Sequence, residues 1–414
     1  MKKINKRLQW FRDAGLGIFI HWGPCAVIGR GEWVKHQENI PDEEYDSCIR
    51  KFQAEKYNPD EWVKLAKEAG ANYMVLITKH HDGYCLFDTK TTDYNSVKRG
   101  PKKDLTSEFV KACRKHKMRV GLYFSLPDWR TPAFFDGPEK NPEGWNKFVD
   151  FAHRQVSELM SNYGKIDLLW YDNILKQSGD RSLKANDYKA KKLEKMVRKL
   201  QPEIIINDRS LISCDFYTAE QNARPPEDKS RLWEACMTMN KHWSYFPSDK
   251  IWKTPAEIIN TLTGIASNEG NMLLNIGPRP DGTIPAPNVR NLKAIGKWLK
   301  IHGEAIYGVE NCPIPTGTAG VFTKKGDALY LIVHWWPGKR LSLPDFPYEI
   351  RSGEILGMKI KIAFKREGQR MILENLPAKA PNPMCSVIKL KLASKEKLRD
   401  MKSKEIYVNF REQN

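Results

Sequence analysis

Apolar and polar positions along the first 300 residues follow two alternating patterns. The run at residues 168–171 is apolar on both faces and too short for a typical helix, which favours a strand buried in a parallel sheet. Seven further segments are expected to form strands: residues 16–22, 73–80, 119–125, 203–208, 214–218, 231–238 and 271–277. The pattern therefore predicts eight strands.

Amphipathic helices are expected between most of these strands. Asn58 can cap a helix that has Pro59 at its first position and stops at Gly70. Thr254 and Glu257 have the spacing of a capping box for another. Helices are also expected at residues 106–117, 141–161, 182–200 and 288–303. Strands and helices that alternate over about 300 residues predict an α/β fold, a (β/α)8 TIM-like barrel.

The pattern changes beyond about residue 309. Short alternating runs at residues 328–335, 359–364 and 386–392 lie between glycines and prolines, as is typical of antiparallel strands. We therefore expect a catalytic barrel at residues 1–308 and a small C-terminal antiparallel β-sandwich domain at residues 309–414. Few ionisable residues cluster at its strand ends, so a packing or carbohydrate-facing accessory role is expected.

Composition narrows the choice of partners. An apolar content of 41% supports a packed core, and no apolar run approaches the length of a membrane span. Much of the net charge of +18 lies at residues 184–199 and 395–404. The first of these segments alternates charge with apolar residues, as a solvated helix face does, and carries no nucleic-acid-binding module. Neither a nucleic acid nor a membrane is expected as a partner.

The eight cysteines show no metal-ligand spacing, and several lie in apolar segments, so buried free thiols are expected. The basic N-terminus precedes an apolar stretch, residues 16–20, that is too short for a secretory signal. A cytoplasmic location is therefore expected.

Ionisable side chains gather at or near the predicted C-terminal ends of the strands, where an α/β barrel keeps its chemistry. They are accompanied by aromatic residues that include Trp22 and Trp129. The candidate site residues are His21, Trp33, His80, His81, Tyr123, Trp170, Asp172, Arg209, Glu220 and Glu234.

A metal centre is not expected among them, and neither is a cofactor. His80 and His81 are adjacent and should point to opposite sides of a strand, and no metal-binding histidine spacing occurs. Neutral imidazoles suit hydrogen bonds to substrate hydroxyls.

Two carboxylates beside aromatic walls suggest the cleavage of glycosides, in which one carboxylate traps the anomeric carbon and a carboxylic acid protonates the leaving oxygen. Asp172, on a short side chain at a strand end, suits the nucleophile, although it could instead cap the following segment. Glu220 or Glu234 suits the acid/base, and Glu234 could instead pair with Arg231. These alternatives remain open at this point.

Five motifs in register resemble the α-L-fucosidases of glycoside hydrolase family 29. They are GIFIHWG at residues 17–23, KHHDG at 79–83, LLWYD at 168–172, NDR at 207–209 and NMLLNIGP at 271–278. The resemblance implies a retaining exo-hydrolase that releases terminal α-L-fucose through a covalent fucosyl-enzyme. It implies Asp172 as nucleophile and Glu220 as acid/base. The sugar pocket would be lined by His21, His80, His81, Tyr123 and Arg209, with Trp33 and Trp170 as its aromatic wall.

Ser244 stands where the family is expected to have glycine. The resemblance therefore does not determine the leaving-group side of the pocket. Two alternatives to a fucosidase also remain: a barrel glycosidase for another sugar, such as an α-galactoside, and a catalytically silent carbohydrate-binding barrel. The expected partner is a small or oligosaccharide α-L-fucoside. The sequence leaves open whether the chain forms a homo-oligomer.

Overall fold

The computed structural model describes residues 5–173, 183–312, 314, 319–358 and 360–394. The chain divides into two compact units, Met1–Ile258 with Glu269–Lys300 and Ile259–Asn268 with Ile301–Asn414. The domain boundary expected between residues 308 and 309 stays a prediction. The basic segment at residues 395–404 lies outside the described residues.

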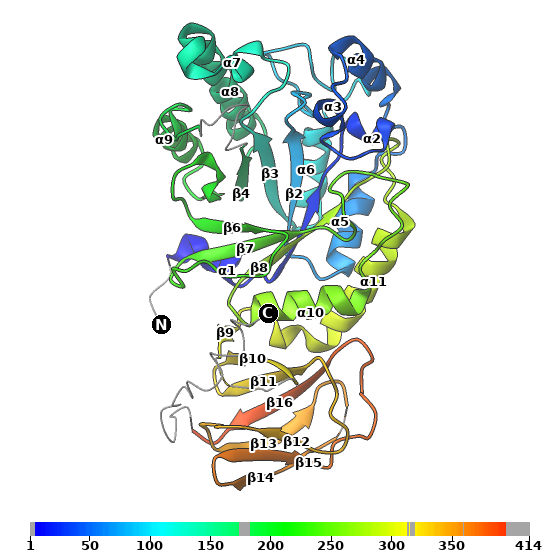
Figure 1. Cartoon of the computed structure of the whole chain (residues 1–414), viewed down its shortest axis with the longest axis vertical. Coiled ribbons are helices and arrows are strands. Elements are labelled where there is room, and N and C mark those ends of the chain that lie inside the picture. The colour runs from blue at the N-terminus through cyan, green and yellow to red at the C-terminus, as the bar shows by residue number, and fades with distance from the viewer. Residues whose placement is uncertain (1–4, 174–182, 313, 315–318, 359, 395–414) are drawn as a thin grey trace. The chain divides into compact units, whose positions relative to one another are not determined.

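The larger unit contains a sheet of eight parallel strands (Figure 1). Their order is β5-β4-β3-β2-β1-β8-β7-β6, and a parallel bridge between Asn207 and Phe216 joins the two ends of the sheet. The predicted (β/α)8 barrel is thus confirmed. The strands are β1 (Leu16–Ile20), β2 (Tyr73–Lys79), β3 (Arg119–Ser125), β4 (Leu168–Asp172), β5 (Ile205–Ile206), β6 (Phe216–Glu220), β7 (Leu232–Met237) and β8 (Asn271–Ile276).

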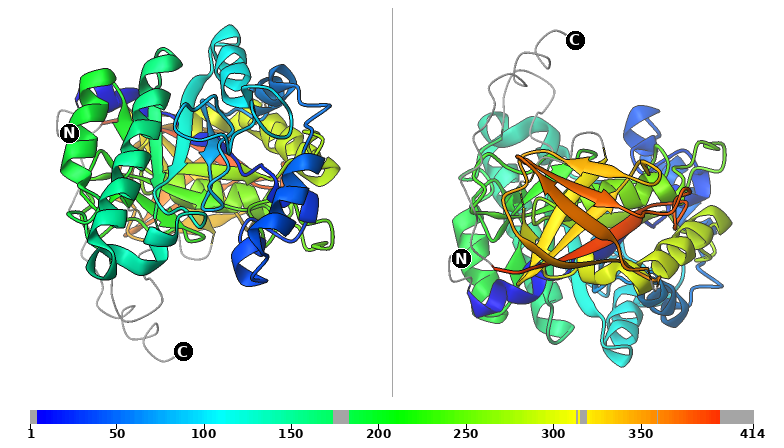
Figure 2. Two further views of the ribbon diagram at one scale, coloured as in Figure 1. Left: turned by 90° about the horizontal axis from the view of Figure 1, so that it is seen from above. Right: turned by 90° about the horizontal axis from the view of Figure 1, so that it is seen from below.

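Helices of this unit lie around the strands when it is seen from above (Figure 2). Short polar side chains begin several of them as expected: Asn58 accepts the N–H of Glu61, and Asn141 that of Gly144. The helix predicted from residue 182 begins only at Ala190, after a turn. Over both units, the helices are α1 (Gln9–Arg12), α2 (Cys25–Ile28), α3 (Val34–Gln37), α4 (Asp42–Lys51), α5 (Pro59–Glu68), α6 (Leu105–Lys115), α7 (Pro132–Lys140), α8 (Pro142–Asn162), α9 (Ala190–Leu200), α10 (Pro255–Ala266) and α11 (Ala286–His302), with 3-10 turns η1 (Lys6–Leu8), η2 (Asp208–Ser210) and η3 (Gly303–Ala305).

Large aromatic side chains fill the barrel interior. Tyr73, on β2, is fully buried, and its ring lies where a Cβ on Gly17 of β1 would be, 2.3 Å from the nearest ring atom. Phe11 closes the N-terminal end of the barrel and packs on Phe216 with ring centroids 4.5 Å apart. Glycine at position 17 is thus required because a tyrosine crosses the barrel beside it.

The junction between β5 and β6 depends on charge more than on strand pairing. β5 has only two residues, where a strand had been predicted over residues 203–208. Asp215, just before β6, pairs with Arg7 at 2.5 Å and Arg198 at 3.1 Å, and it accepts the N–H of Ile206. Burial raises the pKa of Asp215, but the two arginines and this N–H outweigh it and hold the pKa below its ordinary value.

The smaller unit has two antiparallel sheets, in the orders β13-β16-β11-β10-β9 and β12-β15-β14. One apolar cluster contains Leu331 and Leu390 from the first sheet and Leu343 and Leu373 from the second, so the two sheets share a core and the predicted β-sandwich is confirmed. The strand expected from residue 359 begins at residue 363. The strands are β9 (Glu310–Asn311), β10 (Gly320–Lys325), β11 (Ala328–Val333), β12 (Leu341–Leu343), β13 (Ile350–Ile355), β14 (Ala363–Glu367), β15 (Arg370–Glu374) and β16 (Ser386–Leu392).

Each of the eight cysteines lies within the described residues and is a free thiol, as expected. Among the helices that the structure describes, none has both the length and the apolar composition to cross a membrane.

Gly296, in α11, provides a test of the barrel's outer layer. A Cβ at this position would lie 1.8 Å from the carbonyl oxygen of Glu68, so Gly296→Ala must move the backbone of a neighbouring helix. We expect the free energy of unfolding to fall by about 3 kcal/mol. Gly264→Ala in α10 is the matched control, because nothing lies within 4 Å of its Cβ and alanine favours a helix by about 1 kcal/mol. Thermal melting that ranks the two variants in the opposite order would contradict this packing.

Candidate active site

A pocket of about 110 Å³ opens at the C-terminal ends of the barrel strands. It brings together all the predicted site residues except Glu234. Its lining residues are Phe19, His21, Glu32, Trp33, His80, His81, Tyr123, Trp170, Asp172, Asn173, Arg209, Glu220, Cys236 and Trp243.

Asp172 is the last residue of β4, and three groups orient its carboxylate. The Tyr123 hydroxyl donates to Oδ2 at 2.8 Å, and the Asn173 N–H donates to Oδ1 at 2.9 Å. Arg209 Nη1 lies 3.6 Å from Oδ1. Burial raises the pKa of Asp172, while Arg209 and the two hydrogen bonds act in the opposite direction. The carboxylate is therefore held in one orientation, while burial leaves its negative charge little exposed to water. Both properties suit a nucleophile.

Arg209 joins the two candidate catalytic carboxylates. It lies in η2, directly after β5, and its Nη2 donates to Glu220 Oε2 at 2.9 Å. Burial lowers the pKa of Arg209, but the charges of Asp172 and Glu220 outweigh it and raise the pKa above its ordinary value. Arg209 is thus a permanent cation between an aspartate and a glutamate.

Glu220 ends β6, with 42% of its side chain exposed. A second carboxyl group faces this side of the pocket: Glu32, whose Oε2 accepts the N–H of Ser244 at 3.1 Å. Burial raises the pKa of Glu32, and the nearby charge of Glu220 raises it further. Sequence reasoning missed Glu32 as a site residue, because it lies in the long segment between β1 and β2 and not at a strand end. The glycine and tryptophan on either side of it were its only signal.

The hydrogen-bond network assigns the tautomer of His21. Its Nδ1 lies 2.7 Å from Asn275 Oδ1, and Asn275 Nδ2 donates to the carbonyl of Trp243 at 2.6 Å. Since the amide oxygen can only accept, His21 Nδ1 carries the proton. Burial lowers the pKa of His21 to about 3, so the ring is neutral and Nε2 can accept a hydrogen bond.

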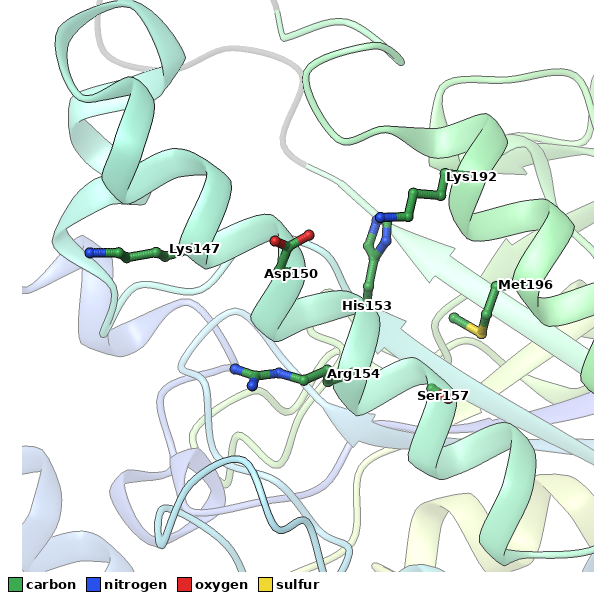
Figure 3. Close-up of a pocket in the computed structure, with 7 residues that line it drawn as sticks. All are labelled: Lys147, Asp150, His153, Arg154, Ser157, Lys192 and Met196. Atoms are coloured by element: carbon green, nitrogen blue, oxygen red, sulfur yellow. The ribbon is translucent and has the colours of Figure 1, made fainter.

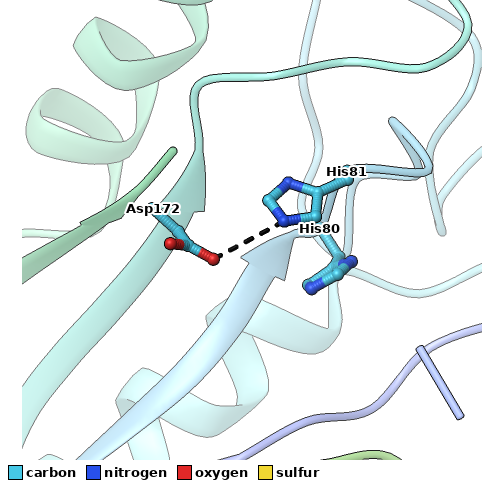
Figure 4. Close-up of side chains that lie close together, drawn as sticks. All are labelled: His80, His81 and Asp172. Atoms are coloured by element: carbon cyan, nitrogen blue, oxygen red, sulfur yellow. Dashed lines mark ion pairs between the residues drawn. The ribbon is translucent and has the colours of Figure 1, made fainter. Parts of the chain in front are cut away.

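His81 is assigned in the same way. Its Nδ1 lies 2.6 Å from Ser125 Oγ, which donates to the carbonyl of Pro127 at 2.7 Å, so His81 Nδ1 is the donor to Ser125. Burial lowers the pKa of His81 to about 3, and the charge of Lys79 contributes. Its Nε2 lies 3.6 Å from Asp172 Oδ2 (Figure 4). Two acceptors thus face each other, and a ligand hydroxyl could donate to either.

His80 also lines this pocket, and the expectation that it would diverge from His81 is wrong. β2 ends at Lys79, so strand alternation does not apply to the two histidines, and their ring centroids lie 4.2 Å apart. The His80 ring stacks on Tyr123 at 5.9 Å, and its buried Nδ1 contacts no hydrogen-bonding group of the described residues.

Together with Asp172, the two histidines form a group whose ligand atoms lie within 4.8 Å of one another (Figure 4). This geometry could approach a metal ion, but the Arg209 cation 3.6 Å from Asp172 would repel one. A neutral ligand rich in hydroxyl groups fits the donors and acceptors better. The absence of a metal stays a prediction.

Three indole rings border the pocket. Trp170 stacks on Tyr123 at 5.5 Å, Trp33 meets His81 edge-on at 5.3 Å, and Trp243 lies 5.0 Å from His21. Trp243 follows β7 in a loop and had not been selected as a site residue. These apolar faces can pack against the C–H groups of a small ligand.

Glu234 does not reach the pocket, which corrects its selection as a substrate-binding residue. It pairs in register with Asn271, the first residue of β8, and therefore lies deep in the barrel, with no exposed surface. Its carboxylate accepts from Tyr73 Oη and, at 2.9 Å, from Trp170 Nε1. The alternative partner Arg231 instead pairs with Asp208, at 3.4 Å.

Another hollow lies on the outer surface between α8 and α9 (Figure 3). Its charged side chains pair locally: Lys147 with Glu143 at 2.7 Å, and Asp150 with Lys189 at 3.7 Å. No pair of carboxylates converges among its lining residues, so it lacks the features of the strand-end pocket.

Comparison with known proteins agrees with this geometry. A family model described as alpha-L-fucosidase matches residues 1–304. The tissue alpha-L-fucosidase of Bos taurus is 32% identical over 357 residues, which cover 79% of this chain and 75% of that protein.

Solved structures agree over most of the chain. Alpha-L-fucosidase isoenzyme 1 from Paenibacillus thiaminolyticus has a TM-score of 0.87 and 33% identity, covering 94% of this chain and 99% of that one. A GH29 alpha-L-fucosidase from Bacteroides thetaiotaomicron, captured as a trapped covalent intermediate in complex with 2-fluoro-fucosyl fluoride, has a TM-score of 0.87 and 28% identity, covering 95% and 97%.

The buried carboxyl group of Glu234 gives a pH-dependent prediction. Burial raises its pKa to about 7, whereas an unfolded chain has about 4.3. Between these values the unfolded chain binds fewer protons, so this group lowers the free energy of unfolding as the pH rises, by about 4 kcal/mol in total. Glu234→Gln removes this titration.

Urea unfolding of wild type and Glu234→Gln at pH 5 and pH 8 measures the effect. The unfolding free energy of the variant relative to wild type should rise by about 3 kcal/mol between the two pH values. Glu203→Gln, at an exposed position, controls for loss of a surface charge. A difference that does not change with pH would show that Glu234 ionises normally in the folded protein.

Proposed function

The chain belongs to the α-L-fucosidase family of glycoside hydrolases, and from this premise we propose that it is a retaining exo-hydrolase. It would remove terminal α-L-fucose from fucosylated glycans by double displacement, with Asp172 as nucleophile and Glu220 as acid/base. The supporting observation is the position of Asp172, partly buried at a strand end with its carboxylate held by Tyr123, Asn173 and Arg209. The covalent intermediate trapped in the Bacteroides relative supports the same course.

In the first step an Asp172 oxygen bonds to the anomeric carbon of fucose while the glycosidic C–O bond breaks. The electron pair of that bond goes to the leaving oxygen, which takes a proton from Glu220. In the second step Glu220 accepts a proton from water, whose oxygen attacks the anomeric carbon and frees Asp172. Two inversions leave the anomeric configuration unchanged.

The remaining side chains bind and orient the sugar. Neutral His21 and His81 each offer an Nε2 that can accept a hydrogen bond from a sugar hydroxyl. Arg209 donates and also balances the charge of the two carboxylates. Trp33 and Trp170 provide apolar surface, which suits a sugar that carries a methyl group in place of a hydroxymethyl group.

The proposed course is tested by NMR of the first sugar anomer released from nitrophenyl α-L-fucoside. We expect α-L-fucose first. Asp172→Gly should lower turnover about a thousandfold or more, because it removes the oxygen that bonds to the anomeric carbon. Added azide should partly restore turnover by replacing the nucleophile and should give β-L-fucosyl azide.

β-L-Fucose as the first product would refute the retaining mechanism. Asp172→Asn is the matched control, since it keeps the side-chain shape and leaves no room for azide. Faster cleavage of nitrophenyl galactoside than of the fucoside would refute the preference for fucose.

The acid/base assignment is tested by leaving-group dependence. Glu220→Ala should lower kcat/KM about a hundredfold or more for a fucosylated disaccharide, whose leaving oxygen needs a proton. A fucoside with a good leaving group should lose far less in its first step. Glu32→Ala is the comparison variant, because Glu32 is the neighbouring carboxyl group in this pocket. If Glu32→Ala shows the leaving-group dependence and Glu220→Ala does not, Glu32 is the acid.

A further inference from the structure

A second cavity, of about 160 Å³, lies beside the pocket and is larger than it. The segment from Asn240 to Trp252, which follows β7, and residues 275–288 after the end of β8 form its walls. Trp243 lines both cavities, so the two are neighbours. We propose that the cavity is a subsite for the sugar to which fucose is linked, the leaving group of the reaction; this rests on the proposed function.

The first argument for this subsite is the buried side-chain amide of Asn288. Asn288 is 3% exposed and lines the cavity, and its Nδ2 contacts Met239 Sδ at 3.3 Å. Its Oδ1 accepts no hydrogen bond from any described group. A buried carbonyl oxygen without a donor costs free energy, which a ligand hydroxyl would recover. The amide is therefore placed to accept a hydrogen bond from a bound molecule.

The rest of the lining suits a saccharide. Arg279 engages the cavity wall only through Nη1, by long contacts to Thr283 Oγ1 at 3.4 Å and the Ile284 carbonyl at 3.5 Å. No carboxylate of the described residues pairs with it, so its other N–H groups can donate to a ligand. Trp252 and Phe246 add aromatic surface. Apolar faces with a few convergent donors and acceptors are what a sugar-binding site requires.

The loop that forms the outer wall is preorganised. The Asp249 carboxylate accepts the N–H groups of Lys241 and Ile251 and lies 2.9 Å from His242 Nδ1. His242 in turn stacks on Phe246 with ring centroids 4.0 Å apart. A ligand would therefore enter a cavity whose wall is already ordered, which lowers the entropic cost of binding.

Ser244 lines the second cavity and contacts Glu32, a residue of the fucosyl pocket. Its N–H holds Glu32 beside Glu220, on the side of the pocket from which the leaving oxygen would be protonated. Its hydroxyl contacts Cys25 Sγ at 3.2 Å in the interior. A Cβ at Gly277 would lie 2.8 Å from the backbone of residue 244, so β8 and this loop pack closely. The bond to Glu32 uses the backbone N–H, which glycine would also provide, so only the hydroxyl contact with Cys25 depends on the serine side chain.

The test compares two substrates that share the fucosyl ring. α-L-Fucosyl fluoride has a leaving group of one atom, which cannot reach the second cavity. Fucosyl disaccharides with galactose or N-acetylglucosamine as the second sugar would place that sugar in it. The variants are Asn288→Leu, which removes the amide at similar volume, and Trp252→Ala, at a partly exposed position. Ile251→Ala is the control, because Ile251 neighbours Trp252 but is 66% exposed and lies outside the cavity lining.

We expect both variants to lower kcat/KM for the preferred disaccharide at least tenfold while kcat/KM for fucosyl fluoride stays within twofold of wild type. Ile251→Ala should change neither. Equal losses on both substrates, or no loss on either, would overturn the subsite, as would a wild type that hydrolyses the fluoride but neither disaccharide. A wild type inactive on both substrates would instead refute the proposed function itself. Circular dichroism identifies a variant that fails to fold, and the other variant then decides.

Discussion

One cation between two carboxylates is the interaction on which the site depends. Arg209 lies 3.6 Å from Asp172 and 2.9 Å from Glu220, and it is the charge that lets two acids share a partly buried pocket. The neighbouring histidines are neutral and could not replace it. Since Asp172 ends β4, Arg209 follows β5 and Glu220 ends β6, this arrangement needs three neighbouring parallel strands in register. The barrel provides that register through buried backbone pairing.

The barrel interior and the site form one continuous column of contacts. Tyr73 donates to Glu234, Glu234 accepts from Trp170, Trp170 stacks on Tyr123, and Tyr123 donates to Asp172. Each contact fixes the side chain above it, so the position of the Asp172 carboxylate is set from deep within the core. Burying the Glu234 carboxyl group at this depth costs free energy, and its two hydrogen bonds, from Tyr73 and Trp170, offset part of that cost. The orientation of Asp172 is thus a property of packing as well as of the strand end.

The sequence predicted correctly those pocket residues that lie at the ends of strands. Asp172 and His21 follow clear apolar runs, and the polar residue after such a run lies at the barrel rim. Glu234 was misplaced because its strand begins only two residues earlier, and register with β8, which the sequence does not reveal, puts it in a lower layer. Glu32 and Trp243 come from long connecting segments, whose course depends on tertiary contacts that no periodicity reports. The sequence motifs predicted the family, whereas the second cavity could be found only in the three-dimensional structure.

The two-residue strand β5 has a consequence for how the molecule would come apart. The wall that carries Arg209 is held by few backbone bonds and by the ionic cluster around Asp215, both weaker than the ladders elsewhere in the sheet. Fluctuations should therefore begin at this seam, well below the energy of global denaturation. Opening there would move the Arg209 guanidinium away from Asp172 and Glu220. Heat or concentrated salt would therefore inactivate the enzyme while most of its sheet was still intact.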